Sequence, residues 1–132
     1  MTTFIDTSGV LAVLDRSDQE HRRAAAAWEE LVRSESPLVT TSYVLIELVA
    51  LAQNRLGIDS VRDIDGALMP LLQVVWVDAE LHSRGLAALL TAGRRRLSLV
   101  DCVSFEVMRE RGIETCFTID KHFAEHGFEP IP

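Results

Sequence analysis

Short apolar segments alternate with longer amphipathic ones along the whole of this 132-residue chain. The short segments are rich in β-branched and aromatic residues, as buried strands are: TTFID, PLVT, QVVWVD, TCFTID and FEPI. Strands that alternate with helices fold into a mostly parallel sheet with helices on both faces. We therefore predict one three-layer α/β/α domain over residues 1–132 with a central, mostly parallel β-sheet.

The longer segments carry signals for the ends of helices. Gly57, Gly93 and Gly112 each follow an amphipathic run, and a glycine in this position commonly ends a helix. The helices expected are SGVLAVLD, roughly residues 18–34, TSYVLIELVALAQNRLG, residues 59–70, AELHSRGLAALLTAG and LSLVDCVSFEVMRERG. In sheets of this kind, functional sites lie beyond the carboxyl ends of the strands.

The overall charge limits how the chain can meet nucleic acid. Its 20 acidic and 13 basic residues give a net charge of −7, which argues against binding of nucleic acid by bulk electrostatic attraction. The sequence has neither a secretory signal nor an apolar run long enough to span a membrane, so we expect a cytoplasmic protein that does not associate with a membrane. Any contact with nucleic acid must then be local.

Two aspartates follow predicted strands directly. Asp6 ends the run FID and precedes Thr7 and Ser8, while Asp120 follows the run FTI. Because the carboxyl ends of parallel strands meet at one edge of a sheet, both side chains are expected at the same edge. Each aspartate could also simply cap the helix that follows it.

Two further acids interrupt apolar helical segments. Glu47 lies within VLIELVAL and Asp101 within LSLVDCVSF. A carboxylate on an apolar face requires compensation of its charge, although Glu47 could instead occupy a thin exposed side of its helix. Ser98 and Asp101 also have the spacing of a helix capping box, and this capping role is compatible with a side chain that points into a cleft.

If these four acids converge, their charges must be compensated. Carboxylates about 6 Å apart repel by about 3 kcal/mol per pair at an effective dielectric constant of 20, so six pairs approach about 17 kcal/mol. This repulsion exceeds the usual stability of a domain, which is about 5–15 kcal/mol. Some of the acids must be protonated, or a cation must lie among them. Oxygen ligands without a histidine or cysteine cluster favour Mg²⁺ or Mn²⁺ over zinc.

The four acids and their surroundings resemble the PIN-domain ribonucleases, and specifically the VapC-type toxins of bacterial toxin-antitoxin pairs. The resemblance covers nearly the whole chain. It rests on an acid with hydroxyl residues after the first strand, a glutamate in an apolar third helix, an aspartate in LSLVDCVSF, and the closing pattern T-x-D-x-x-F. The residues that carry it are Asp6, Thr7, Ser8, Glu47, Asp101, Thr118, Asp120 and Phe123.

The resemblance implies a metal-dependent endoribonuclease. In it, Asp6, Glu47, Asp101 and Asp120 would form the catalytic and metal-binding group for Mg²⁺ or Mn²⁺, with Asp6 and Asp101 as the direct ligands. It also implies an RNA substrate, a small antitoxin partner and a homodimer. Thr7, Ser8 and Thr118 are secondary candidates that could orient carboxylates or meet a phosphate.

The run Gly93–Arg96 offers a second secondary candidate. Arg94, Arg95 and Arg96 precede the Asp101 helix and could contact RNA phosphates at the edge of the acidic cleft. Cations at the end of a helix also stabilise its dipole, which is an equally simple explanation. Lys121 and His122 are interpreted as incidental neighbours of Asp120.

Two other classes of function stay open at the level of sequence. A phosphoryl-accepting or receiver-like protein also places acids at strand ends, but Ser8 stands where a phosphatase of this kind would carry a second acid. The other class is a non-catalytic module whose acidic cleft captures the basic tail of a partner. Binding of Mg²⁺ or Mn²⁺ would argue against this second class.

Overall fold

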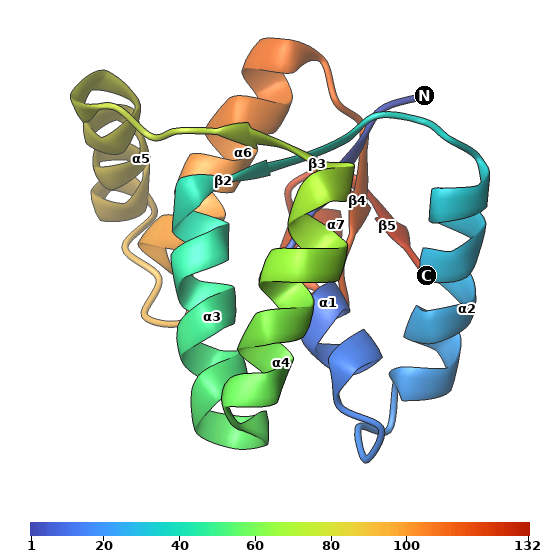
Figure 1. Ribbon diagram of the computed structural model, residues 1–132. Coiled ribbons are helices and arrows are strands. Elements are labelled where there is room, and N and C mark those ends of the chain that lie inside the picture. The colour runs from blue at the N-terminus through green and yellow to red at the C-terminus, as the bar shows by residue number, and fades with distance from the viewer.

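A five-stranded sheet forms the centre of the computed structural model, which describes all residues 1–132 (Figure 1). The strand order is β3-β2-β1-β4-β5, and every neighbouring pair is parallel. The strands are β1 (Thr3–Ile5), β2 (Leu38–Thr41), β3 (Leu72–Val75), β4 (Thr115–Phe117) and β5 (Glu129–Ile131). The prediction of an α/β fold is confirmed, and the sheet is entirely parallel.

Side chains of the central strands alternate between the two faces of the sheet, as the period of a strand requires. Phe4 and Cys116 belong to one buried cluster, whereas their neighbours Ile5 and Phe117 belong to the other. Helices cover both faces because both faces are apolar. The helices are α1 (Thr7–Leu14), α2 (His21–Arg33), α3 (Ser42–Leu56), α4 (Ile58–Asp63), α5 (Ala79–Ala92), α6 (Leu99–Arg111) and α7 (His122–Glu125).

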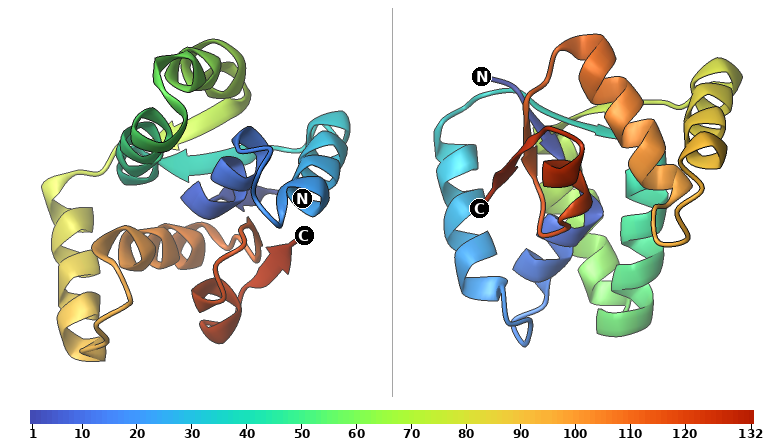
Figure 2. Two further views of the ribbon diagram at one scale, coloured as in Figure 1. Left: turned by 90° about the horizontal axis from the view of Figure 1, so that it is seen from below. Right: turned by 180° about the vertical axis from the view of Figure 1, so that it is seen from behind.

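The two layers of helices differ in what they contribute. The cluster on one face includes residues of α5, α6 and α7, and the cluster on the other includes residues of α1, α2, α3 and the π-helical turn after α4 (Ile64–Leu68). Figure 2 shows the two layers on opposite sides of the sheet. Gly85 of α5 permits a close approach to α6, since a Cβ atom on it would lie 2.5 Å from Cγ2 of Val103.

Three predicted boundaries differ from the structure. The helix expected over residues 59–70 is divided into α4, a π-helical turn (Ile64–Leu68) and a 3₁₀ turn (Met69–Leu71), and Pro70 lies in the last of these. The strand expected over QVVWVD ends at Val75, and Trp76 beyond it is 72% exposed. The second helix begins at His21 and not near residue 18.

All four carboxylates of the predicted site follow strands or lie in the helices that begin beside them. Asp6 follows β1 directly, and Asp120 follows β4 after two residues. Glu47 lies in α3, which begins where β2 ends, and Asp101 lies in the first turn of α6. None of the helices combines the length and the apolar character that a membrane-spanning segment needs.

Candidate active site

One cleft of about 310 Å³ brings the four predicted acids together. It lies at the carboxyl edge of the sheet, where α1 and α3 pack against each other. The acids Asp6, Glu47, Asp101 and Asp120 all line this cleft. Segments that are more than 110 residues apart in sequence therefore meet in one place, as the strand-end argument predicted.

Asp6 is the most deeply buried of the four acids and is held by two hydroxyl groups. It is 3% exposed and caps the first turn of α1. The hydroxyl of Ser8 lies 2.8 Å from Asp6 Oδ2, and that of Thr118 lies 2.9 Å from the same oxygen. Ser8 Oγ also accepts the backbone N–H of Ile119 at 2.9 Å. These contacts join the start of α1 to the loop after β4.

Burial raises the pKa of Asp6 to about 6. The two hydrogen bonds from Ser8 and Thr118 lower this pKa, because they stabilise the ionised carboxylate. The negative charges of Asp101 and Asp120 raise it further. Without a cation, the ionisation of Asp6 is opposed by its surroundings, and a bound cation would remove that opposition.

Glu47 is half-buried and faces the other acids across the cleft. Burial raises its pKa, and the charges of Asp101 and Asp120 add to the rise. The hydroxyl of Thr7 acts in the opposite direction and lowers the pKa of Glu47. The interpretation of Glu47 as a merely exposed residue is wrong, because the residue is half-buried and lines the cleft.

Asp101 has both of the roles that its sequence suggested. Its backbone N–H donates to Ser98 Oγ at 3.0 Å, and its Oδ2 accepts the backbone N–H of Ser98 at 3.2 Å, which completes the capping box. The same side chain lines the cleft. Burial is the main reason why its pKa is raised, and the charge of Asp120 contributes to the rise.

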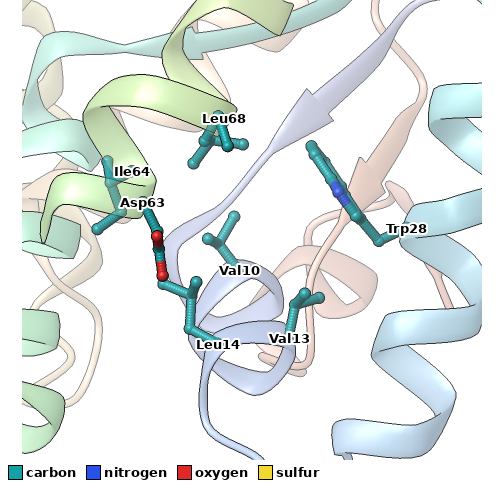
Figure 3. A pocket seen from close by; sticks show the side chains of 8 residues that line it. Val10, Val13, Leu14, Trp28, Asp63, Ile64 and Leu68 are labelled. Carbon is teal, nitrogen blue, oxygen red and sulfur yellow. The ribbon is translucent and has the colours of Figure 1, made fainter. Parts of the chain in front are cut away.

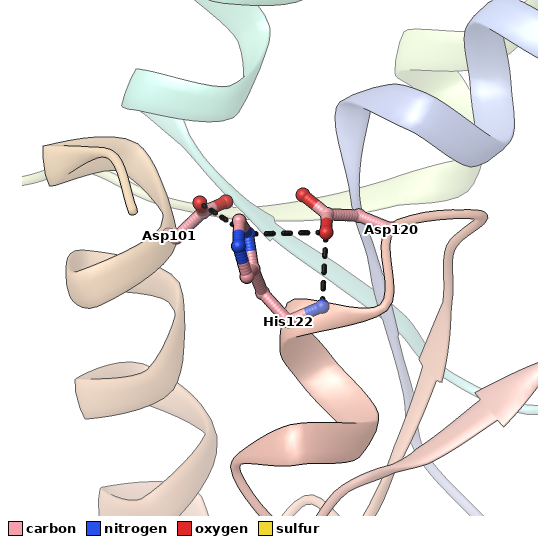
Figure 4. A group of neighbouring side chains, drawn as sticks. All are labelled: Asp101, Asp120 and His122. Carbon is pink, nitrogen blue, oxygen red and sulfur yellow. Dashed lines mark hydrogen bonds and ion pairs between the residues drawn. The ribbon is translucent and has the colours of Figure 1, made fainter. Parts of the chain in front are cut away.

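His122 lies beside two of the acids, contrary to its interpretation as an incidental neighbour. Its Nδ1 is 3.1 Å from Asp120 Oδ1 and 3.5 Å from Asp101 Oδ2 (Figure 4). The residue is 8% exposed, and Nδ1 makes no well-aligned hydrogen bond with either oxygen. Asp120 Oδ1 also accepts the backbone N–H of His122 at 2.9 Å, but Lys121 occupies the N-cap position of α7, so the alternative interpretation of Asp120 as the N-cap is wrong.

The donor set fits a hard divalent cation. Four carboxylates line the cleft, and one potential ligand atom each from Asp101, Asp120 and His122 lie within 4.8 Å of one another. Carboxylate oxygens suit Mg²⁺ and Mn²⁺, while an imidazole nitrogen suits later transition metals. A single histidine lies among the acids, and it forms no histidine or cysteine cluster. The oxygens still outnumber the single nitrogen.

The secondary candidates divide into two groups. Thr7 and Ser8 line the cleft, and Ser8 and Thr118 hold Asp6, so these hydroxyl residues are part of the site's architecture. The three arginines of the 94–96 run are exposed and do not line the cleft. Arg94 instead pairs with Glu125 at 3.1 Å.

Sequence reasoning missed two charged residues of the cleft, Asp18 and Arg55. Arg55 could have been found, because it lies eight residues after Glu47 and therefore on the same side of α3. Asp18 lies in an irregular loop between α1 and α2, where no periodicity places a side chain.

A second, apolar pocket of about 120 Å³ lies between α1, α2 and the π-helical turn that follows α4 (Figure 3). Trp28 lines it from α2, and Val10 and Leu14 line it from α1. The indole of Trp28 also packs on Phe117, with the ring centroids 5.4 Å apart. Trp28 therefore belongs both to the core and to a pocket that opens to the surface.

Comparison with known proteins identifies the family. Residues 3–129 match the family model of the PIN domain. The chain belongs to the PIN-domain family. This PIN domain is 33% identical over 130 residues to the 23S rRNA-specific endonuclease VapC20 of Mycobacterium tuberculosis, a match that covers 97% of this chain and 96% of the relative.

Solved structures of PIN proteins resemble this one closely. The crystal structure of Mycobacterium tuberculosis VapC20, described as a toxin that cleaves the sarcin-ricin loop, superposes with a TM-score of 0.85 and 31% identity over the whole of both chains. FitAcB from Neisseria gonorrhoeae gives a TM-score of 0.68 at 18% identity, covering 100% of this PIN domain and 97% of that chain. At that identity the likeness shows the fold alone.

Proposed function

We propose that this PIN domain, as a single domain over residues 1–132, is the toxin of a toxin-antitoxin pair and a metal-dependent endoribonuclease. The observation that carries the proposal is the convergence of Asp6, Glu47, Asp101 and Asp120 on one cleft at the carboxyl edge of the sheet. The full-length similarity to a ribosomal RNA endonuclease supports it. Cleavage of a phosphodiester bond is the reaction that such a group of carboxylates serves.

The carboxylates are proposed to hold one or two Mg²⁺ or Mn²⁺ ions, with Asp6 and Asp101 as direct ligands. The bound metal would acidify a water molecule and neutralise charge that develops on the phosphate oxygens. Ser8 and Thr118 fix the orientation of Asp6, and the capping box fixes that of Asp101. Glu47 and Asp120 contribute further negative charge from α3 and from the loop after β4.

The proposed substrate is the sarcin-ricin loop of 23S ribosomal RNA. VapC20, which shares about a third of its residues with this chain over its full length, is described as a 23S rRNA-specific endonuclease and, in its crystal structure, as a toxin that cleaves the sarcin-ricin loop. An RNA of defined shape also suits the charge of the molecule, because a chain with net charge −7 must recognise its target locally. Ribosomes are cytoplasmic, and we propose that the protein acts there.

The proposed partners are a small antitoxin protein and a second copy of this chain. Full-length similarity to a toxin supports the antitoxin. The apolar pocket that Trp28 lines is the surface we propose for an apolar side chain of the antitoxin. A Trp28→Ala variant would then bind the antitoxin more weakly and still cleave RNA.

The test of the proposed function is cleavage of a labelled RNA that carries the sarcin-ricin loop, by the chain freed of co-purified antitoxin. The reaction is run with Mn²⁺, with a chelator, and with the variants Asp6→Asn and Asp101→Asn. We expect cleavage that requires the metal and that falls by at least about 100-fold in both variants. Total tRNA serves as the competing substrate.

The matched control is Asp65→Asn, which removes an exposed aspartate outside the cleft. Cleavage by this variant should equal that of the unmodified protein. Equal cutting by folded Asp6→Asn or Asp101→Asn would refute the proposed centre. Stable phosphorylation of an aspartate by acetyl phosphate would instead favour the receiver-like class.

A further inference from the structure

We propose that Arg55 binds a backbone phosphate of the RNA substrate beside the carboxylate centre, and so positions the strand that is cut. The inference deepens the proposed function and rests on it. Neither the predicted site nor the similarity to known proteins assigns a role to this residue. Three observations support this role: Arg55 lines the cleft, it lies on the same side of α3 as Glu47, and it is not paired with an acid.

The phase of α3 places Arg55 in the cleft. Glu47, Leu51 and Arg55 are separated by four residues each, and all three line the same cleft. Residues at this spacing lie above one another on one side of a helix. Helix α3 packs against α1, which begins directly after Asp6. The Arg55 side chain therefore leaves α3 on the side that faces the acidic centre.

Arg55 is also the single basic residue among the side chains that line the cleft. Five acids line the same space: Asp6, Asp18, Glu47, Asp101 and Asp120. Despite these acids, the guanidinium group of Arg55 makes no hydrogen bond and no ion pair within the chain. Arg62 and Arg94, in contrast, are paired with Asp59 and Glu125.

An unpaired guanidinium at the rim of an acidic cleft is suited to phosphate. Its planar donors match two phosphate oxygens at once, which the compact ammonium of lysine does not do. RNA that approaches the carboxylates meets like charge, and Asp18 adds to this repulsion outside the four-acid centre. One cation at this point would offset that repulsion and hold the backbone in register.

The distance along α3 indicates which phosphate is bound. Eight residues of α-helix correspond to about 12 Å along its axis between Glu47 and Arg55. That offset is longer than the spacing of adjacent phosphates, so Arg55 meets a phosphate further along the strand, while the scissile phosphate lies at the carboxylates. Arg55 is thus a binding residue for the substrate, and its loss should affect affinity more than the chemical step.

Arg55 also lies in the last turn of α3, where any cation stabilises the helix dipole. This structural role predicts that Arg55→Lys behaves as the unmodified protein in every respect. Phosphate binding predicts a different order, because lysine keeps the charge and loses the paired donors. The three side chains should then rank Arg, Lys, Gln in affinity for RNA.

The experiment measures binding of the sarcin-ricin-loop RNA between 50 and 300 mM salt, in the Asp101→Asn background so that the RNA stays intact. Loss of one phosphate contact should lower the slope of log affinity against log salt by about 0.7–0.9. We expect this change in Arg55→Gln and not in Arg111→Gln, which removes an exposed arginine at the far end of α6. In the active chain, Arg55→Gln should lower kcat/KM by about tenfold, mostly through KM.

An unchanged salt slope in folded Arg55→Gln would overturn the inference, and so would an equal change in Arg111→Gln. Wild-type affinity of Arg55→Lys together with a lower melting temperature of Arg55→Gln would assign the residue to the helix dipole. The failure of the proposed function looks different: the unmodified chain would cut no RNA with Mn²⁺, whatever the salt slope. If the chain cuts RNA and the dependence of affinity on salt is the same with and without Arg55, the proposed function stands and only the role of Arg55 is refuted.

Discussion

The hydroxyl of Thr118 lies 2.9 Å from Oδ2 of Asp6 and donates a hydrogen bond to it across 112 residues of sequence. Thr118 is 2% exposed, and Asp6 is 3% exposed. This bond joins the loop after β4 to the end of β1, and the two strands are parallel neighbours in the sheet.

Removal of this hydroxyl should destabilise the protein through Asp6. In Thr118→Val the shape is kept and the donor is lost, so the pKa of Asp6 should rise further. We expect a loss of about 2 kcal/mol in the free energy of unfolding at pH 7, typical of a hydrogen bond to a charged group. Chemical denaturation measures it. Thr118→Ser keeps the donor, and equal stabilities of the serine and valine variants would contradict the prediction.

The raised pKa of Asp6 predicts how stability depends on pH without metal. The native pKa of about 6 lies above the ordinary value of 3.8, so between these values the folded state holds more protons than the unfolded state. The contribution of Asp6 is therefore complete below about pH 4 and is lost as the pH rises through about 6. The shift corresponds to about 3 kcal/mol.

Asp6→Asn removes this penalty. With a chelator present, the variant should be more stable than the unmodified protein at pH 7.5, and the two should converge near pH 4. Denaturation by urea at several pH values measures the difference. Asp65→Asn is the control, since Asp65 is exposed and lies outside the cleft. A difference between Asp6→Asn and the unmodified protein that is constant from pH 4 to 7.5 would refute the assignment.

His122 should support metal binding. Because its Nδ1 lies against Asp101 and Asp120, His122→Phe should lower the affinity for Mn²⁺ by about 10- to 100-fold. Calorimetric titration measures the affinity, and the rise in melting temperature with Mn²⁺ gives an independent readout. His82→Phe is the control, because His82 on α5 contacts Tyr43. Equal affinity of His122→Phe and the unmodified protein would contradict this prediction.

The close approach of α5 to α6 predicts a packing defect. A Cβ atom at Gly85 would lie 2.5 Å from Cγ2 of Val103, whose side chain is fully buried. Gly85→Ala should therefore destabilise the protein by about 1–3 kcal/mol, as overpacking does. The double variant with Val103→Ala should recover part of this loss. Thermal unfolding of the four proteins in the cycle tests the coupling.

Much of the fold was predictable because its signals are local. The alternation of strand and helix segments indicates a parallel sheet, and that topology alone brings Asp6 and Asp120 to one edge. Asp101 could be assigned two roles, since the capping box is read from spacing and the cleft from its apolar flanks. The prediction was a mostly parallel sheet, and the observed sheet is parallel throughout, including β5.

Other features depend on directions that sequence does not fix. The position of His122 depends on how a four-residue helix leaves the loop after β4, and no periodicity can be read from so short an element. The division of residues 59–70 into an α-helix, a π-helical turn and a 3₁₀ turn likewise depends on tertiary packing. Pro70 lies in the last of these and marks the end of the helical segment. The position of Arg55, in contrast, does follow from sequence, because its spacing from Glu47 places both residues on one side of α3.

The bond between Asp6 and Thr118 also bears on the moment at which the protein can first become toxic. A chain still under synthesis has Asp6, Glu47 and Asp101 before it has Thr118 and Asp120, and the loop that closes the cleft belongs to the late segment. Until that segment leaves the ribosome, the nascent polypeptide holds only part of its cutting centre. The topology thus delays completion of the carboxylate cleft until the end of synthesis.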